Sequence, residues 1–300
     1  AGTVAGSLLG YAVLGRSVHG LNQVAAMITG SYIGGGVNFT ALADAFKVDG
    51  TVISATVVAD NLNMAIYFLI LIAAAGSAFF RKYYKHPHID DVIVNGKSEE
   101  GETLAAKYWG RKEISLKDIA LNFMYAVIVV ALSKFIAAAL GGFIPKSDWF
   151  LQMCNTFFGS QYVWITVLAM CFATFFHKQA AAMHGAQELG TYLIYLFFFV
   201  IGVPASVMEI IQNAPLLLIF CLIVVLVNMT FCFVFGKLFK FDLEDIILAS
   251  NANIGGPTTA AGMAISQGWY KLVGPCMLVG TFGYVIGTYL GIIVGSILGL

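Results

Sequence analysis

The sequence predicts an all-α polytopic membrane protein that contains two structural repeats. Hydrophobic residues make up 59% of the 300 residues and charged residues only 11%, whereas a soluble domain carries about 25% charged residues. Apolar stretches long enough to cross a bilayer, which takes about 20 residues, recur along the chain, and glycine-rich segments interrupt two of them. We therefore expect an integral, multi-pass protein in contact with the lipid bilayer.

The two interruptions have similar sequences. The first break, residues 31–43, reads Ser-Tyr-Ile-Gly-Gly-Gly-Val-Asn-Phe-Thr-Ala-Leu-Ala. The second break, residues 251–264, reads Asn-Ala-Asn-Ile-Gly-Gly-Pro-Thr-Thr-Ala-Ala-Gly-Met-Ala. Such residues break the helical hydrogen-bond ladder, and non-helical backbone is tolerated at membrane depth only where protein buries it or it lines a water-filled cavity. Each break therefore predicts a broken helix or a re-entrant hairpin.

The breaks superimpose at an offset of 221 residues, which places Ile33-Gly34-Gly35 on Ile254-Gly255-Gly256. A long apolar stretch follows each of them, at residues 51–80 and 272–298. Paired Gly/Pro-interrupted segments in corresponding halves are the best sequence sign of a transporter's binding site. We therefore assign residues 1–80 to the C-terminal part of one repeat, 81–117 to a polar connector and 118–300 to a second repeat.

The remaining elements follow from the apolar stretches in chain order. The expected elements are the end of a span at residues 3–14, a broken helix at 21–46, a long helix at 51–80, a span at 119–140, a loop or surface helix at 141–157, spans at 158–176, 189–211 and 215–235, a broken helix at 243–266 and a last helix at 272–298. The chain opens without Met inside an apolar stretch, and the first repeat has no room for preceding helices. We therefore expect N-terminal helices of a longer protein to be missing.

The orientation of the two repeats stays open at this stage. Basic residues at 81–85, 177–178 and 237–240 would all be cytoplasmic under the positive-inside rule. The four spans counted between the long helix and the second break then give both repeats the same orientation, whereas inverted repeats need an odd number of crossings. Either one span is miscounted, with residues 141–157 the first candidate, or the repeats are parallel.

Asp60 is the sharpest polar signal. It lies about ten residues into the 51–80 helix, near the middle of a bilayer at about 1.5 Å rise per residue. Ionisable residues inside a membrane are costly and mark function by default. The alternative is a structural polar contact or a position nearer the interface. Asn61 follows directly.

The breaks supply neutral polar groups. Exposed carbonyls at broken helix ends suit Na⁺, and exposed N–H groups suit a carboxylate; the glycines also allow close helix packing, and both roles can coexist. The predicted substrate- or ion-binding residues are Gly34, Gly35, Gly36, Asn38, Thr40, Asp60, Asn61, Asn251, Asn253, Gly255, Gly256, Pro257, Thr258 and Thr259. A Na⁺ ion would lie near Asn38, Asp60, Asn253 and Thr259, and we expect no other cofactor.

Four segments carry a family resemblance: Tyr-Ile-Gly-Gly-Gly-Val-Asn-Phe at 32–39, Ala-Asp-Asn-Leu at 59–62, Glu-Leu-Gly-Thr-Tyr-Leu-Ile-Tyr-Leu-Phe-Phe at 188–198 and Asn-Ile-Gly-Gly-Pro-Thr-Thr-Ala at 253–260. Over essentially its whole length the chain resembles the YjcL-like membrane proteins of bacteria and plastids. That family is grouped with cation–proton antiporters and with bile-acid, glutamate and citrate sodium symporters. The resemblance implies a mobile transport domain with crossing broken helices beside a scaffold domain, often dimeric, that works as an elevator. The clan's antiporters keep an acidic pair where this chain has Asp60-Asn61.

These observations favour a secondary active transporter, with Na⁺- or H⁺-coupled symport of a small organic anion as the leading interpretation. A Na⁺/H⁺-type antiporter that uses Asp60 is the second interpretation, and a non-transporting scaffold or receptor with a transporter fold is the third. No nucleophile–base arrangement is present, so we expect no enzyme. The 16 basic and 16 acidic residues argue neither for nor against nucleic acid, and we expect no such partner. The expected location is an inner or plasma membrane, or a plastid membrane in a plant.

Overall fold

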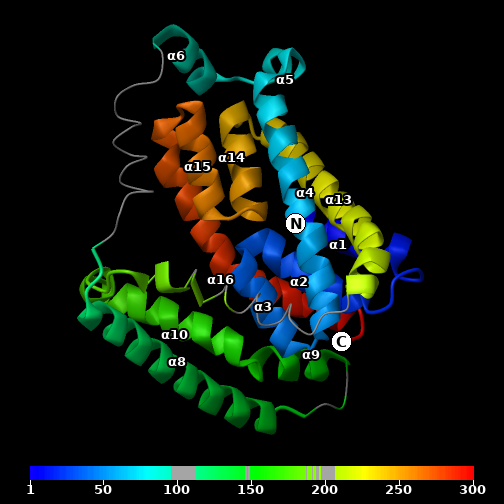
Figure 1. Ribbon diagram of the computed structural model, residues 1–300, viewed down its shortest axis with the longest axis vertical. Coiled ribbons are helices and arrows are strands. Elements are labelled where there is room, and N and C mark those ends of the chain that lie inside the picture. Colours follow the sequence, from blue (N-terminus) through cyan, green and yellow to red (C-terminus); the bar gives the residue numbers. More distant parts are fainter. Residues whose placement is uncertain are drawn as a thin grey trace.

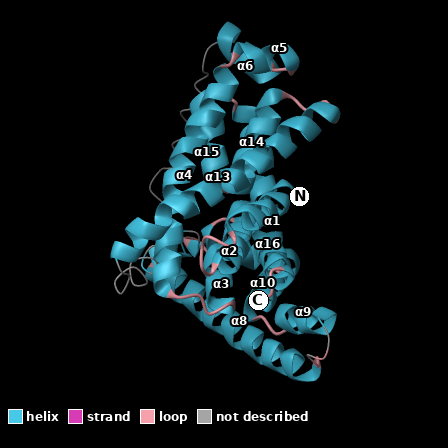
Figure 2. Cartoon of the chain, turned by 90° about the vertical axis from the view of Figure 1, so that its right-hand side faces the viewer, coloured by secondary structure: helices cyan, strands magenta, loops and turns pink. Residues whose placement is uncertain are grey.

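The computed structural model describes residues 1–95, 113–145, 147, 149–186, 188–190, 192, 193, 196 and 207–300. In these residues the chain forms helices joined by loops, without a strand (Figure 2). Helices of this part that are long and apolar enough to cross a membrane are α4 (Gly50–Gly76), α8 (Leu116–Phe143), the segment Ala214–Leu238 of α13 (Val207–Leu238), and the segment Tyr270–Ile297, which comprises η1 (Tyr270–Leu272) and α16 (Val273–Ile297). The prediction of an all-α polytopic membrane protein is confirmed.

Both predicted broken helices are broken at their glycines. The first consists of α2 (Leu21–Gly34) and α3 (Gly36–Ala45), and the second of α14 (Leu243–Ile254) and α15 (Pro257–Gln267). Pro257 occupies the first position of α15, where its missing N–H costs no helical hydrogen bond. The glycines and the proline thus end one half-helix and begin the next.

Helix α16 is the central element, because it packs along α2 and also contacts α3, α14 and α15. One face of α16 carries Gly280, Gly283, Gly287 and Gly291, at helical spacings of three and four. A Cβ atom on Gly280 would lie 2.6 Å from the backbone nitrogen of Pro257. Glycines on this face therefore let both broken helices approach the α16 backbone closely.

Helices α1 (Gly2–Leu14), α4 and α13 lie together on the other side of the broken helices (Figure 1). Helix α13 packs against both α1 and α4. A Cβ atom on Gly6 of α1 would lie 2.8 Å from the Cα atom of Val224, so a small residue is needed where α1 crosses α13. This layer holds Asp60 of α4 against α2 and α13.

A second group of helices lies at one end of the molecule. Helices α8 and α10 (Gln161–Phe175) pack against each other, and α9 (Trp149–Phe158) and α10 contact α16 (Figure 1). The short α11 (His177–Ala181) follows α10. The Asn155 side chain donates hydrogen bonds to the carbonyl oxygens of Gly141 and Ile144, at 2.7 and 2.6 Å, and so holds α9 against the C-terminal end of α8. Of the loop or surface helix predicted at 141–157, residues 141–143 belong to the end of α8 and 149–157 to α9.

The polar connector is tied to the second broken helix. Helix α5 (Ala78–Tyr83) and helix α6 (Pro87–Asn95) lie at the opposite end from α8 (Figure 2). Glu244 in the first turn of α14 accepts a hydrogen bond of 2.6 Å from the Ile89 backbone N–H, and the Leu243 N–H donates to the Lys85 carbonyl at 2.7 Å. These bonds fix the position of α6 relative to α14.

Two helix boundaries differ from the prediction. The long helix predicted at 51–80 ends at Gly76, because Ser77 has an extended backbone (φ −74°, ψ 124°) and α5 begins after it. Helix α13 begins at Val207 and contains Pro215, but its segment that is long and apolar enough to cross a membrane, Ala214–Leu238, matches the span predicted at 215–235. Neighbouring groups in membrane proteins can satisfy the carbonyl that such a proline leaves free. The span predicted at 189–211 falls largely outside the described residues.

Candidate functional site

The two breaks share one unusual backbone conformation. Gly35 has φ 74° and ψ −175°, and Gly256 has φ 86° and ψ 176°. This region of backbone space is essentially restricted to glycine. The two glycines are also the residues that superimpose at the offset of 221. Sequence equivalence and backbone conformation therefore coincide at this pair.

Tyr284 of α16 lies where the two breaks meet. A Cβ atom on Gly35 would lie 3.2 Å from Cε1 of the Tyr284 ring, and one on Gly256 would lie 3.6 Å from its hydroxyl oxygen. The tyrosine is 37% exposed. The N-termini of α3 and α15 begin directly after these glycines, so two positive helix ends lie next to one aromatic ring.

The polar side chains of the second break hold the broken helix together. The Thr259 hydroxyl donates a 3.0 Å hydrogen bond to Oδ1 of Asn251, and Nδ2 of Asn251 donates to the Thr259 carbonyl at 3.3 Å. Asn251 is completely buried. Because the two residues lie on either side of Gly255-Gly256, they join α14 to α15. Thr258, in the first turn of α15, is partly buried.

Asn253 connects the second break to the first through Thr3 of α1. The Nδ2 atom of Asn253 donates to the Thr3 hydroxyl at 2.9 Å, and that hydroxyl donates to the Tyr32 carbonyl at 3.3 Å. Asn228 of α13 also donates to the Thr3 hydroxyl, at 2.8 Å. Thr3 thus bridges both broken helices, and no pattern in the sequence indicates this role.

In the first break, Asn38 fastens α3 to α16. Its Oδ1 atom accepts a 2.6 Å hydrogen bond from the Thr288 hydroxyl, and its amide lies against Gly34 and Gly287. Asn38 is 3% exposed, and its Nδ2 atom is buried without a hydrogen-bond partner. Thr40 instead donates to the carbonyl of Val37 in its own helix, at 2.8 Å. The structure therefore brings Asn38 to the site but not the Thr40 hydroxyl.

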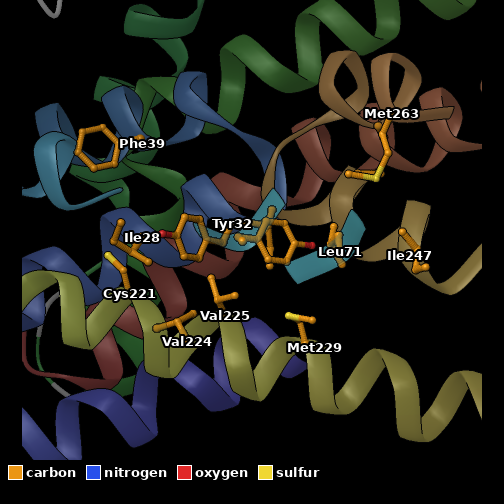
Figure 3. Close-up of a cluster of buried hydrophobic side chains, with 14 of the residues drawn as sticks. Ile28, Tyr32, Phe39, Leu71, Cys221, Val224, Val225, Met229, Ile247 and Met263 are labelled. Atoms are coloured by element: carbon orange, nitrogen blue, oxygen red, sulfur yellow. The ribbon is translucent and has the colours of Figure 1, made fainter. Parts of the chain in front are cut away.

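Asp60 lies beside Tyr32 of α2 and Cys221 of α13, and its carboxyl interacts with the Tyr32 hydroxyl. Figure 3 shows Tyr32 next to Ile28 and close to Cys221 of α13. The Oδ1 atom of Asp60 is buried without a hydrogen-bond partner. Asn61, which the sequence paired with Asp60, is exposed and does not share this environment.

Asn63, and not Asn61, shares the Tyr32 hydroxyl with Asp60. Its Nδ2 atom donates a 2.8 Å hydrogen bond to the Tyr32 hydroxyl, and the residue is completely buried. The next residue, Met64, reaches the second break, because a Cβ atom on Gly255 would lie 3.1 Å from its terminal methyl group. Helical spacing could have identified Asn63, since residues three apart share a helix face and adjacent residues do not.

Two further observations limit the chemistry of the site. Within the described residues, no group of three His, Cys, Asp or Glu side chains could hold a metal ion. A cavity of about 500 Å³ lies between the end of α13, α14 and the start of α16, and its lining includes Cys232, Asp245 and Cys276. None of the predicted binding residues lines this cavity, so it is separate from the breaks.

The profile of a family described as "Protein of unknown function (DUF819)" matches residues 1–299. The chain belongs to this family. It is also 45% identical over 295 residues to a protein of Bacillus subtilis (strain 168) named "Uncharacterized membrane protein YjcL", and the match covers 98% of this chain and 72% of the relative. No solved structure matches the chain. With its apolar helices, the family member is an integral, multi-pass membrane protein.

Proposed function

We propose that the protein is a secondary active transporter, with ion-coupled symport of a small organic anion as its activity. The observation that carries the proposal is the meeting of the two breaks on one side chain, Tyr284, in a membrane protein. Secondary transporters place substrate and coupling ions where discontinuous helices meet. A packing role alone would not require two glycine-only backbone conformations at the same point.

The geometry favours an anion with a carboxylate group. Helices α3 and α15 begin at the breaks with backbone N–H groups that have no intrahelical partner. Because Pro257 has no N–H, the first such groups of α15 belong to Thr258 and Thr259. The partly exposed Tyr284 ring adds an apolar surface and a hydroxyl beside them. A carboxylate would face the helix ends while the rest of a small molecule contacts the ring.

The repeat, the elevator motion and a dimer are part of this proposal. The matched backbones of Gly35 and Gly256 support an internal repeat. The two broken helices with α16 would form the mobile transport domain. A scaffold domain and a second subunit would complete the assembly, as in the transporters that the sequence resembles.

A second candidate is a Na⁺/H⁺-type antiporter, favoured by one observation. The Asp60 carboxyl has a buried oxygen without a hydrogen-bond partner, next to neutral groups only. In that case Asp60 would exchange a proton for a cation, and no organic substrate would be needed.

The third interpretation is a membrane receptor or scaffold, which would bind a ligand at the breaks without moving it across the membrane.

The experiment is uptake into proteoliposomes of purified protein. Radiolabelled glutamate, citrate and taurocholate would be tested under imposed Na⁺ and proton gradients, with empty liposomes and the Gly256→Leu variant in parallel. Accumulation of one carboxylate that depends on a gradient and is lost in Gly256→Leu supports symport. Gradient-driven proton movement without any carboxylate supports antiport. Carboxylate binding without flux would support the receptor and contradict transport.

A further inference from the structure

Two buried oxygen atoms on one face of α4 lack hydrogen-bond donors. They are Oδ1 of Asp60 and Oδ1 of Asn63. Asn63 is completely buried, and Asp60 is partly buried. Buried polar atoms without partners are rare in native proteins, and each needs an explanation such as an ion, a water molecule or a functional role.

The two side chains converge on a single hydroxyl group. Nδ2 of Asn63 donates to the Tyr32 hydroxyl at 2.8 Å, and the same hydroxyl interacts with the Asp60 carboxyl. Asp60 and Asn63 are three positions apart in α4, which puts them on the same helix face. Three oxygen-bearing groups from α2 and α4 therefore surround one point.

An ionised Asp60 would leave an uncompensated negative charge at this point. Among the described residues, no lysine, arginine or histidine forms an ion pair with Asp60, and the titratable groups that face it are Tyr32 of α2 and Cys221 of α13. Both neighbours are neutral acids. A buried carboxylate needs a partner of opposite charge or a bound proton.

The position of these groups links them to both breaks. Tyr32 lies two residues before Gly34, and its carbonyl accepts the hydrogen bond from Thr3, which also holds Asn253. Met64, next to Asn63, contacts Gly255. Asp60 is therefore connected to the first broken helix directly through Tyr32, and to the second through Thr3 and Asn253 or through Met64.

We propose that Asp60, Asn63 and Tyr32 form a binding site for one monovalent cation, H⁺ or Na⁺, which lies beside the breaks and not at their junction. The two ions share the relevant chemistry, since either one neutralises the carboxylate. A proton would bind to the Asp60 carboxyl, whereas Na⁺ would take the Asp60, Asn63 and Tyr32 oxygens as ligands. The side chains of Asn38 and Thr259, where Na⁺ ligands were expected, instead hold helices together. Asn38 bonds to Thr288, and Thr259 bonds to Asn251.

The role of this cation as the coupling ion rests on the proposed function, but its binding does not. Binding can be measured without transport, so the two proposals fail separately. If the cation binds and no carboxylate is carried, the transport proposal is wrong and the site stands. If a carboxylate is carried and the cation response does not depend on Asp60, the site is wrong and transport stands.

The test is the thermal unfolding midpoint of the purified protein in lipid nanodiscs. One series replaces choline chloride with NaCl at constant ionic strength and pH, and a second varies the pH in choline chloride. The parent protein is compared with Asp60→Asn, which removes the charge, and with Tyr32→Phe, which removes only the hydroxyl. The matched control is Asn61→Ala, because Asn61 is the exposed neighbour of Asp60.

For a Na⁺ site, NaCl raises the midpoint of the parent and of Asn61→Ala by several degrees at about 100 times the dissociation constant. Asp60→Asn loses this shift, and Tyr32→Phe needs more NaCl to reach it. For a proton site, NaCl has no effect, and the difference in midpoint between the parent and Asp60→Asn changes with pH. The infrared C=O band of a protonated carboxyl group is then present in the parent and absent in Asp60→Asn.

The proposal is overturned if the parent and Asp60→Asn respond alike to both NaCl and pH. A Na⁺ response that persists in Asp60→Asn would place the ion elsewhere and contradict the assignment equally. If Asp60→Asn does not fold, Tyr32→Phe decides, since a response identical to that of the parent excludes the hydroxyl from the site.

Discussion

Gly35 and Gly256 lie 221 residues apart in the chain, adopt the same extended backbone with positive φ, and contact the same tyrosine ring. An L-residue at either position would have to enter a region that is strongly disfavoured when a Cβ atom is present. The two glycines are therefore required by conformation, and at Gly35 a Cβ atom would also lie close to the Tyr284 ring, at 3.2 Å.

We expect Gly35→Ala and Gly256→Ala each to lower the free energy of unfolding by about 1–3 kcal/mol. Gly274 of α16 is the control, because nothing lies within 4 Å of a Cβ atom placed there. Gly274→Ala should be neutral or should stabilise by up to about 1 kcal/mol. Thermal unfolding in detergent measures all three. Similar unfolding midpoints for all the alanine variants would contradict the conformational argument.

In the transport assay, the leucine variants Gly35→Leu and Gly256→Leu should lose more uptake than Thr259→Ala.

The position of each break could be predicted from the sequence, because glycine and proline act on the backbone locally. The partners of the breaks could not. Tyr284 meets Gly35 through the packing of α16 along α2, and such a register between helices depends on glycines at 283, 287 and 291 meeting the distant backbone of α2. Nothing in the local sequence around Tyr284 specifies that contact.

The environment of Asp60 was predicted in part. Its place on a membrane helix marked it as important, and the structure gives it a buried oxygen. The choice of Asn61 as its neighbour was wrong because adjacent residues point about 100° apart on a helix, and Asn61 is exposed. The contribution of Tyr32 required the packing of α2 against α4, which no pattern within either segment contains.

Thr288→Val tests the attachment of the first break to α16. The Thr288 hydroxyl donates a 2.6 Å hydrogen bond to buried Asn38. Valine keeps the shape and leaves Oδ1 of Asn38 without a donor, so we expect a loss of about 1–3 kcal/mol of stability. Thr281→Val on the same helix is the control, because the Thr281 hydroxyl is exposed and bonds to the Met277 carbonyl of its own helix; its effect should stay within about 0.5 kcal/mol. A loss of the same size in both variants would show that the hydroxyl's partner does not matter.

A double-mutant cycle tests whether Asn251 and Thr259 join the two halves of the second broken helix. The single variants are Asn251→Leu and Thr259→Val, and we expect an interaction energy of about 0.5–3 kcal/mol between them because the side chains bond directly. The control cycle pairs Asn251→Leu with Thr258→Val, one position away, and its interaction energy should be smaller. Unfolding free energies of the five variants and the parent provide both cycles. Additive effects in the first cycle would mean that the pair does not couple α14 to α15.

The last prediction concerns Tyr284, whose ring and hydroxyl lie where both breaks meet. If a carboxylate substrate binds at the helix ends beside this ring, Tyr284→Ala removes the apolar surface and separates the breaks, whereas Tyr284→Phe removes only the hydroxyl. We expect uptake of the carboxylate that the parent carries to fall by about tenfold or more in Tyr284→Ala, equivalent to about 1.4 kcal/mol in the transport barrier, and by less in Tyr284→Phe. Tyr289→Phe is the control, since the Tyr289 hydroxyl of the same helix bonds to Val163 at 3.5 Å, away from the breaks. Unfolding midpoints of all three variants separate lost transport from lost folding. If a folded Tyr284→Ala protein takes up the carboxylate as fast as the parent does, the ring is not part of the substrate site, and binding must rest on the helix ends alone.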